Sequence, residues 1–235
     1  MALQNRVDPF GELIATPARG TLFGNRGGRF HRDDRTLGRR RWASRQWICC
    51  VLQFKGRQRA VWGPGYTELF FLDEVTAFAA GHRPCFECRR ADAKEFAETW
   101  ARANGGKIPH APEMDAVLQR ERLDGRGKRM HEMRVEDLPD GVMLALDGEA
   151  ASAFAVRGSH LLRWSVRGYV EKTARLRGTA KVLTPASIVA VLAAGYRPRW
   201  HPSAQLLPLV PAKAGTQDRE KKELDSRLRG NERNR

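Results

Sequence analysis

Residues 70–90 read FFLDEVTAFAAGHRPCFECRR, and this stretch decides the fold. Its first residues are apolar and predict the end of a buried strand. Asp73 is suited to cap the helix that follows, and Gly81 marks where that helix ends. Cys85 and Cys88 then place two thiols on one tight turn, which is a spacing that zinc sites use.

The same stretch resembles the metal-binding domain of Ada-type DNA alkylation-repair proteins. That family has an aromatic strand end, a short helix, an Ala-Ala-Gly-aromatic-Arg-Pro-Cys turn and a second Cys two residues on, and residues 69–90 follow this order. The family binds zinc with four cysteines, and one of an upstream pair takes a methyl group from DNA phosphotriesters. Residues 54–59, where that pair is expected, contain no Cys. The resemblance therefore implies an Ada-like fold and DNA as a partner, without the methyl transfer.

The remaining cysteines are adjacent and lie in the sequence WICCVLQF, which predicts a strand. Neighbouring strand residues point to opposite faces, so both thiols cannot easily bind one ion. The candidate zinc ligands are Cys85, Cys88, one of Cys49 and Cys50, and a fourth from His82, His31 or water. The alternative is a set of reduced, buried thiols without metal.

Charge is the strongest global signal, with 42 Lys and Arg against 27 Asp and Glu and a net charge of +15. Residues 19–59 hold twelve basic and two acidic side chains, interleaved with aromatic residues. Cations for phosphates and rings for bases predict a nucleic-acid surface; the alternative is a solvated face over a core. The candidate contacts are Arg26, Arg29, Arg32, Arg39, Arg40, Arg41, Trp42, Arg45, Arg83, Arg89 and Arg90.

Two other classes of function remain open. One is an enzyme: a metal-dependent nuclease that uses His31, Asp33 and Asp34, or a thiol-based repair activity at the Cys-x-x-Cys turn. The Asp pair is equally typical of a turn. The other is a module that binds an acidic protein. Four cysteines and the lack of a long apolar run predict a cytoplasmic protein with reduced thiols and no membrane partner.

The expected fold class is α+β, with small antiparallel sheets and short helices. The predicted units are an Arg/Gly-rich segment (1–46), an Ada-like strand–helix–CxxC unit (47–105), a helical linker (106–137), a β-meander with a helix (138–205) and a disordered tail (206–235). Predicted strands cover 47–54, 59–62, 68–72, 142–146, 153–156, 161–165 and 182–183. Predicted helices follow Asp73 and cover 91–103, 112–123 and 186–194, and a flexible loop covers 124–129.

Two further patterns concern the second half of the chain. Residues 193–198 repeat the Ala-Ala-Gly-x-Arg-Pro of residues 79–84, either as two related units or as one helix-ending solution used twice. Residues 211–235 resemble the translated product of a repetitive extragenic palindromic element, so no function is expected there.

Overall fold

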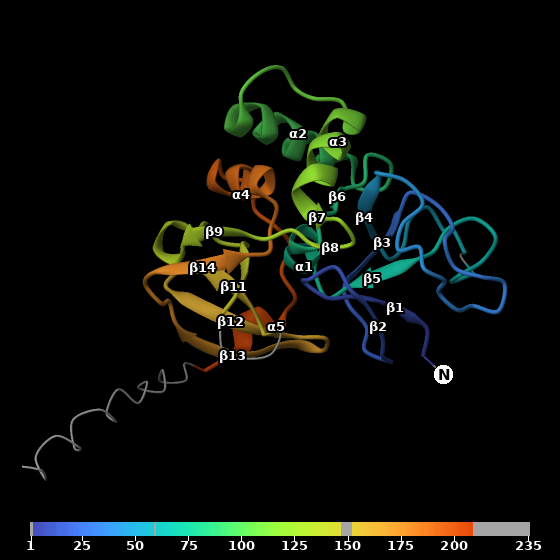
Figure 1. Cartoon of the computed structure of the whole chain (residues 1–235), viewed down its shortest axis with the longest axis horizontal. Coiled ribbons are helices and arrows are strands. Elements are labelled where there is room, and N and C mark those ends of the chain that lie inside the picture. Colours follow the sequence, from blue (N-terminus) through green and yellow to red (C-terminus); the bar gives the residue numbers. More distant parts are fainter. Residues whose placement is uncertain (1, 59, 147–151, 209–235) are drawn as a thin grey trace, which may run out of the picture.

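The computed structural model describes residues 2–58, 60–146 and 152–208 of the chain. These residues form two six-stranded sheets with short helices, which confirms the predicted α+β class (Figure 1). Residues 211–235, which resemble a translated palindromic repeat, lie outside the described residues.

The first sheet has the strand order β2 (Leu13–Ala15), β1 (Gln4–Val7), β5 (Leu69–Phe71), β3 (Leu22–Arg26), β4 (Trp47–Val51) and β6 (Arg83–Pro84). The pairs β1–β5 and β4–β6 are parallel and the others are antiparallel. Three strands therefore precede residue 47. The unit boundary predicted between residues 46 and 47 separates β3 from β4, which are paired in the sheet. Residue 59 of the strand predicted at 59–62 lies outside the described residues, and the rest of that prediction is wrong, because Val61 and Trp62 form a turn.

The second sheet is antiparallel throughout, in the order β13 (Gly168–Ala174), β12 (His160–Ser165), β11 (Ala153–Arg157), β10 (Met143–Ala145), β14 (Thr179–Val182) and β9 (His131–Arg134). The predicted meander corresponds to its centre. The sequence prediction missed both edge strands, β13 and β9, because their residues are largely polar and only half-buried.

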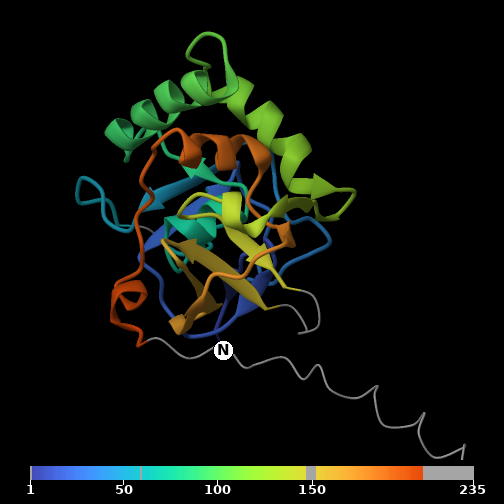
Figure 2. The ribbon, with the colours of Figure 1, turned by 90° about the vertical axis from the view of Figure 1, so that its left-hand side faces the viewer.

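Three helices cover one end of the molecule: α2 (Arg90–Asn104), α3 (Ala111–Arg122) and α4 (Ala186–Ala193) (Figure 2). A short helix, α5 (Ser203–Leu206), packs on β13. Residues 124–129, predicted as a flexible loop, instead form a hairpin of β7 (Leu123–Asp124) and β8 (Gly127–Lys128), followed by a 3-10 turn at Val135–Asp137. In the described part of the chain, no helix is long and apolar enough to cross a bilayer.

The helix α1 (Glu74–Ala79) lies between the two sheets, and all of its residues are buried. Val75 packs against Met143 and Leu162 of the second sheet, whereas Ala77 packs against Phe71 of the first. The predicted cap is present, since the Asp73 carboxylate accepts a hydrogen bond from the Thr76 amide at 2.9 Å. This helix therefore joins the two sheets through shared apolar packing.

The repeated hexapeptide ends a helix at both of its sites. Gly81 follows α1 with φ +81° and Gly195 follows α4 with φ +105°, a backbone conformation that favours glycine. Their surroundings differ: a Cβ at Gly81 would lie 2.7 Å from the Arg122 side chain, whereas nothing lies within 4 Å of one at Gly195. The two copies thus share a helix ending and not an environment.

Candidate metal centre

Three sulfur atoms converge where the first sheet meets the Cys-x-x-Cys turn. The Sγ atoms of Cys50, Cys85 and Cys88 all lie within 4.8 Å of one another. Parallel pairing of β4 with β6 brings them together, because the Cys85 amide donates a hydrogen bond to the Cys49 carbonyl at 3.0 Å. In residues 2–58, 60–146 and 152–208, this is the one group of His, Cys, Asp and Glu side chains close enough to share an ion.

Cys49 lies on the opposite face of β4, as strand alternation requires. Its thiol is fully buried, and Arg89 Nη1 donates a hydrogen bond to its Sγ at 2.9 Å. Arg89 also forms ion pairs with Glu74 and Asp92. Of the two adjacent cysteines, the structure therefore brings only Cys50 to the cluster.

The two histidines considered as ligands lie elsewhere. His82 is fully buried between Trp47 and Phe71, and its Nε2 accepts a hydrogen bond from Arg26 Nε at 3.3 Å. His31 stacks on Trp62 at a ring separation of 5.1 Å. Neither imidazole joins the three thiols. His82 is therefore corrected from a candidate ligand to a buried core residue.

Asp33 and Asp34 of the predicted nuclease cluster lie in a turn. Asp33 pairs with Arg29, and the Asp34 carboxylate accepts hydrogen bonds from the amide and hydroxyl of Thr36 at 2.9 and 2.7 Å. The nearby His31 side chain is buried against Thr67 instead. The two carboxylates and the imidazole do not converge on one point.

Hydrogen bonds among the three thiols shift their pKa values in opposite directions. Hydrogen bonds from Cys50 and Cys88 lower the pKa of Cys85 well below that of a free thiol. Donation to Cys85 and burial raise the pKa of Cys50. The Glu87 amide, 3.4 Å from the Cys85 sulfur, adds a further donor. These donors favour the thiolate form of Cys85, which is the form that binds metal.

The donor set fits zinc. Zinc–sulfur bonds of about 2.3 Å in a tetrahedron place the sulfurs about 3.8 Å apart, which agrees with the observed limit of 4.8 Å. Cys50 and Cys85 are buried, but Cys88 is only half-buried, so the cluster reaches the protein surface. A zinc ion there would have three protein ligands and one further position.

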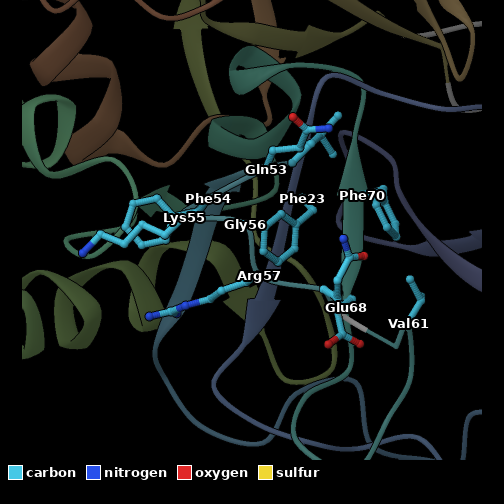
Figure 3. A pocket seen from close by; sticks show the side chains of 11 residues that line it. Phe23, Gln53, Phe54, Lys55, Gly56, Arg57, Val61, Glu68 and Phe70 are labelled. Atoms are coloured by element: carbon cyan, nitrogen blue, oxygen red, sulfur yellow. The ribbon is translucent and has the colours of Figure 1, made fainter.

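A cavity of about 670 Å³ adjoins the cluster (Figure 3). Phe23 connects the two, since it packs with Cys50 and Cys85 and also lines the cavity next to Phe70. The loop between β4 and β5 forms the other wall, and Arg57 of this loop pairs with Glu87 at 2.6 Å. The loop is therefore tied to the Cys-x-x-Cys turn by an ion pair.

The predicted nucleic-acid residues separate into exposed and buried sets. Those exposed on the loop between β3 and β4, or at the start of α2, are Arg29, Arg32, Arg39, Arg40, Arg45 and Arg90, while Arg41 and Trp42 are half-buried. Arg26, Arg83 and Arg89 are buried, with exposed fractions of 1%, 1% and 3%. These three arginines are corrected to internal residues.

The buried arginines have structural partners. Arg83 forms a two-pronged pair with Asp115 at 2.8 and 2.7 Å, and this pair ties β6 to α3. Sequence reasoning also missed Arg122 and Lys128, which line one small hollow together with Arg26. No local sequence signal identifies them, because only the fold brings α3 and β8 to β3.

Comparison with protein-family models, curated proteins and solved structures gives no match for this chain. The Ada-like resemblance of residues 69–90 accordingly stays an expectation from sequence. The arguments for function are the three-cysteine cluster, the adjoining cavity and the distribution of charge.

Proposed function

We propose that this chain is a nucleic-acid-binding protein, with DNA preferred, whose first sheet is stabilised by zinc on Cys50, Cys85 and Cys88. The observation that supports the proposal is a direct connection between the two features. The strand β4 supplies Cys50, and it begins where the exposed, arginine-rich loop of residues 27–46 ends. A metal ion that fixes β4 would therefore fix one end of the loop.

Zinc at this site would link β4 to the turn before α2. These segments are distant in sequence and meet at only a short two-residue strand, β6. A metal bridge stabilises such a junction because binding free energy contributes to folding free energy. The preference for DNA rests on the resemblance of residues 69–90, which is an argument by analogy.

The loop of residues 27–46 has the chemistry of a phosphate-binding surface. It carries seven arginines and two aspartates. One aspartate pairs with Arg29 and the other caps a turn, so most of the arginines keep their charge free for a ligand. The loops between β3, β4 and β5 project together on the side away from the second sheet (Figure 1). Such a surface binds polyanions by releasing their counterions.

The test is fluorescence anisotropy with labelled single-stranded and duplex DNA and RNA at several salt concentrations. The logarithm of the binding constant should fall linearly with the logarithm of salt concentration. Five phosphate contacts would weaken binding by roughly 500-fold over a fourfold rise in salt. A dissociation constant weaker than about 10 μM at about 50 mM salt for every probe would contradict the proposal, since non-specific binders reach that range.

An enzyme is the second candidate, and the cavity beside the cluster favours it. Its volume lies in the range of small-molecule sites, and it is lined by aromatic and polar side chains. Lys55 and Arg57 lie on the same loop, with their side chains extending away from Phe70 (Figure 3). Glu68 is the acidic lining residue, and its Oε2 accepts a hydrogen bond from the Trp62 amide at 2.7 Å. Cleavage or modification of a labelled oligonucleotide that requires Cys88 would support this candidate.

A further inference from the structure

One face of the first sheet carries a row of side chains that leads away from the cysteine cluster. Strand register places Cys50 of β4 opposite Phe23 of β3. It also places Phe23 opposite Phe70 of β5, and Phe70 opposite Arg6 of β1. Paired residues of neighbouring strands point to the same face of a sheet, so all four side chains share this face. The opposite face, which holds Phe71, packs on α1.

The cavity of about 670 Å³ adjoins the middle of this row. Phe23 and Phe70 line it from the sheet, and their ring centroids lie 6.5 Å apart. The loop between β4 and β5 supplies most of the other lining residues (Figure 3). Sites for small molecules have volumes of about 300–1,000 Å³, so this cavity has room for one ligand of that size.

Three cations lie close to the aromatic rings around the cavity. Lys55 Nζ and Arg57 Cζ lie 5.3 and 5.4 Å from the ring centroid of Phe54. Arg6 Cζ lies 4.8 Å from the ring centroid of Phe70. Lys55 and Arg57 are exposed, so their charges are accessible to a ligand. Rings beside cations are what a nucleotide requires, because its base stacks on a ring and its phosphate pairs with a cation.

Glu68 adds a hydrogen-bond acceptor to the lining. Its side chain is buried, with 8% of the residue exposed, and its Oε2 accepts a hydrogen bond from the Trp62 amide at 2.7 Å. Within the part of the chain that the structure describes, no side chain or amide donates a hydrogen bond to Oε1, and no cation forms an ion pair with this carboxylate. A buried acceptor normally has a partner, so Oε1 is suited to accept from an N–H group of a ligand.

We propose that this cavity binds one unpaired nucleobase, with the phosphate of that nucleotide at Lys55 and Arg57 and an N–H group of the base at Glu68. Figure 3 shows Lys55 and Glu68 on opposite sides of the Phe23 ring, which separates the two contacts as a nucleotide requires. The base belongs to a free nucleotide or to a single strand, since a base in a duplex must first leave the stack. The choice of a nucleobase among flat ligands rests on the proposed function.

Glu68 also predicts which base binds best. The Watson–Crick edge of guanine carries two adjacent N–H donors, which match a carboxylate. Uracil has one donor between two carbonyl oxygens, and a carboxylate repels those oxygens. Guanine should therefore bind more tightly than uracil, because the bases of single strands are recognised by hydrogen bonds to this edge.

The experiment is isothermal titration calorimetry of the full chain with guanosine monophosphate, uridine monophosphate and ribose 5-phosphate, which has the phosphate and no base. Guanosine monophosphate should bind most tightly and ribose 5-phosphate most weakly. Phe54→Leu keeps an apolar side chain without the ring and should weaken both nucleotides by about fivefold or more, the loss of one stacking contact. Glu68→Gln keeps an acceptor for the Trp62 amide and should remove the preference for guanine.

Arg57 and its ion-pair partner provide a matched pair of variants. Arg57→Gln removes the cation, whereas Glu87→Gln breaks the same 2.6 Å ion pair and leaves the cation in place. Arg57→Gln should weaken guanosine monophosphate by about tenfold or more, the loss of one charge-assisted hydrogen bond. Glu87→Gln should bind at least as tightly as the wild type. Equal weakening in both variants would contradict a phosphate contact at Arg57.

A second arm distinguishes the two sources of the base. A labelled oligothymidine with one central guanine is bound to the protein, and guanosine monophosphate is added as competitor. Competition would place a base of the strand in the cavity, whereas nucleotide binding without competition would exclude the strand and leave the free nucleotide as the ligand. Replacing Arg32, Arg39 and Arg40 with Gln tests the proposed surface separately, and this variant should bind guanosine monophosphate like the wild type. Nucleotides that bind no more tightly than ribose 5-phosphate would overturn the cavity assignment, whether or not strands bind the loop.

Discussion

The Tyr169 hydroxyl donates a hydrogen bond of 2.9 Å to the buried Asp73 carboxylate, which lies 96 positions earlier in the chain. The same carboxylate oxygen accepts a hydrogen bond from the His201 amide at 3.0 Å. One position on, the Glu74 carboxylate accepts from Tyr196 and from the Arg199 amide. Hydrogen bonds at the start of α1 therefore connect the second half of the chain to the first.

Replacing Tyr169 with Phe should destabilise the whole protein. Asp73 would lose a charge-assisted hydrogen bond inside the structure, which costs about 1.5–3 kcal/mol. Because the contact joins the two sheets, we expect the urea unfolding curve to stay a single transition with a lower midpoint. Tyr66→Phe is the control, since Tyr66 is 53% exposed and its loss should stay within about 0.5 kcal/mol. A variant with two separate transitions would show that the sheets fold independently.

Adjacent cysteines provide a sharp test of the metal centre. Cys50→Ser removes one of the three converging thiols, and Cys49→Ser changes the thiol on the opposite face. We expect protein purified without chelator to hold about one zinc per chain in the wild type and in Cys49→Ser, and far less in Cys50→Ser. Elemental analysis measures this. Under about 0.2 zinc per chain in the wild type, or equal loss in both variants, would show that the cluster is a set of reduced thiols.

The sequence predicted what depends on local pattern. Asp73 caps α1, and Gly81 follows that helix with a positive φ, both as residue type requires. The alternation of strand residues predicted that only one of Cys49 and Cys50 could reach the Cys-x-x-Cys turn. It did not say which one, because that depends on how β4 pairs with β6.

The sequence prediction was wrong for three arginines, because charge alone does not show whether a side chain is exposed or buried. An arginine-rich stretch predicts an exposed surface, yet Arg26, Arg83 and Arg89 are internal. Two of them pair with a carboxylate from another element: Arg83 with Asp115 of α3, and Arg89 with Glu74 of α1. Composition cannot show such pairs, because they exist only once the helices are packed on the sheet.

The stability of the protein should depend on pH through Lys128. Its folded pKa is about 7, below that of an exposed lysine near 10.4, because burial and the neighbouring Arg26 and Arg122 disfavour its charge. Between these values the unfolded chain binds more protons, so the free energy of unfolding should rise as pH increases from about 7 to about 10. In Lys128→Met this contribution disappears.

The measurement for Lys128 is urea unfolding of the wild type and of Lys128→Met across that pH range. The difference between the two curves isolates Lys128 from the other groups that titrate there, among them the cysteines. The methionine variant should gain most over the wild type at pH about 7 and least at pH about 10. Parallel curves would mean that Lys128 stays charged in the folded protein.

The final prediction concerns the exposed loop between β3 and β4. Replacing Arg32, Arg39 and Arg40 with Gln removes three exposed charges and leaves the buried Arg26 in place. If each contacts one phosphate, the slope of binding against salt should fall by up to about three units, and all sequences should weaken similarly. The melting temperature should hardly change, since exposed positions contribute little to stability.

The matched control replaces three exposed arginines of the second half, Arg167, Arg177 and Arg197, with Gln. This variant has the same net charge as the loop variant, so any general effect of charge on association appears equally in both. A loss of slope confined to the loop variant would locate the phosphate contacts on residues 27–46. Equal losses would mean that binding follows net charge alone, and an unchanged slope in both would place the interface on other residues.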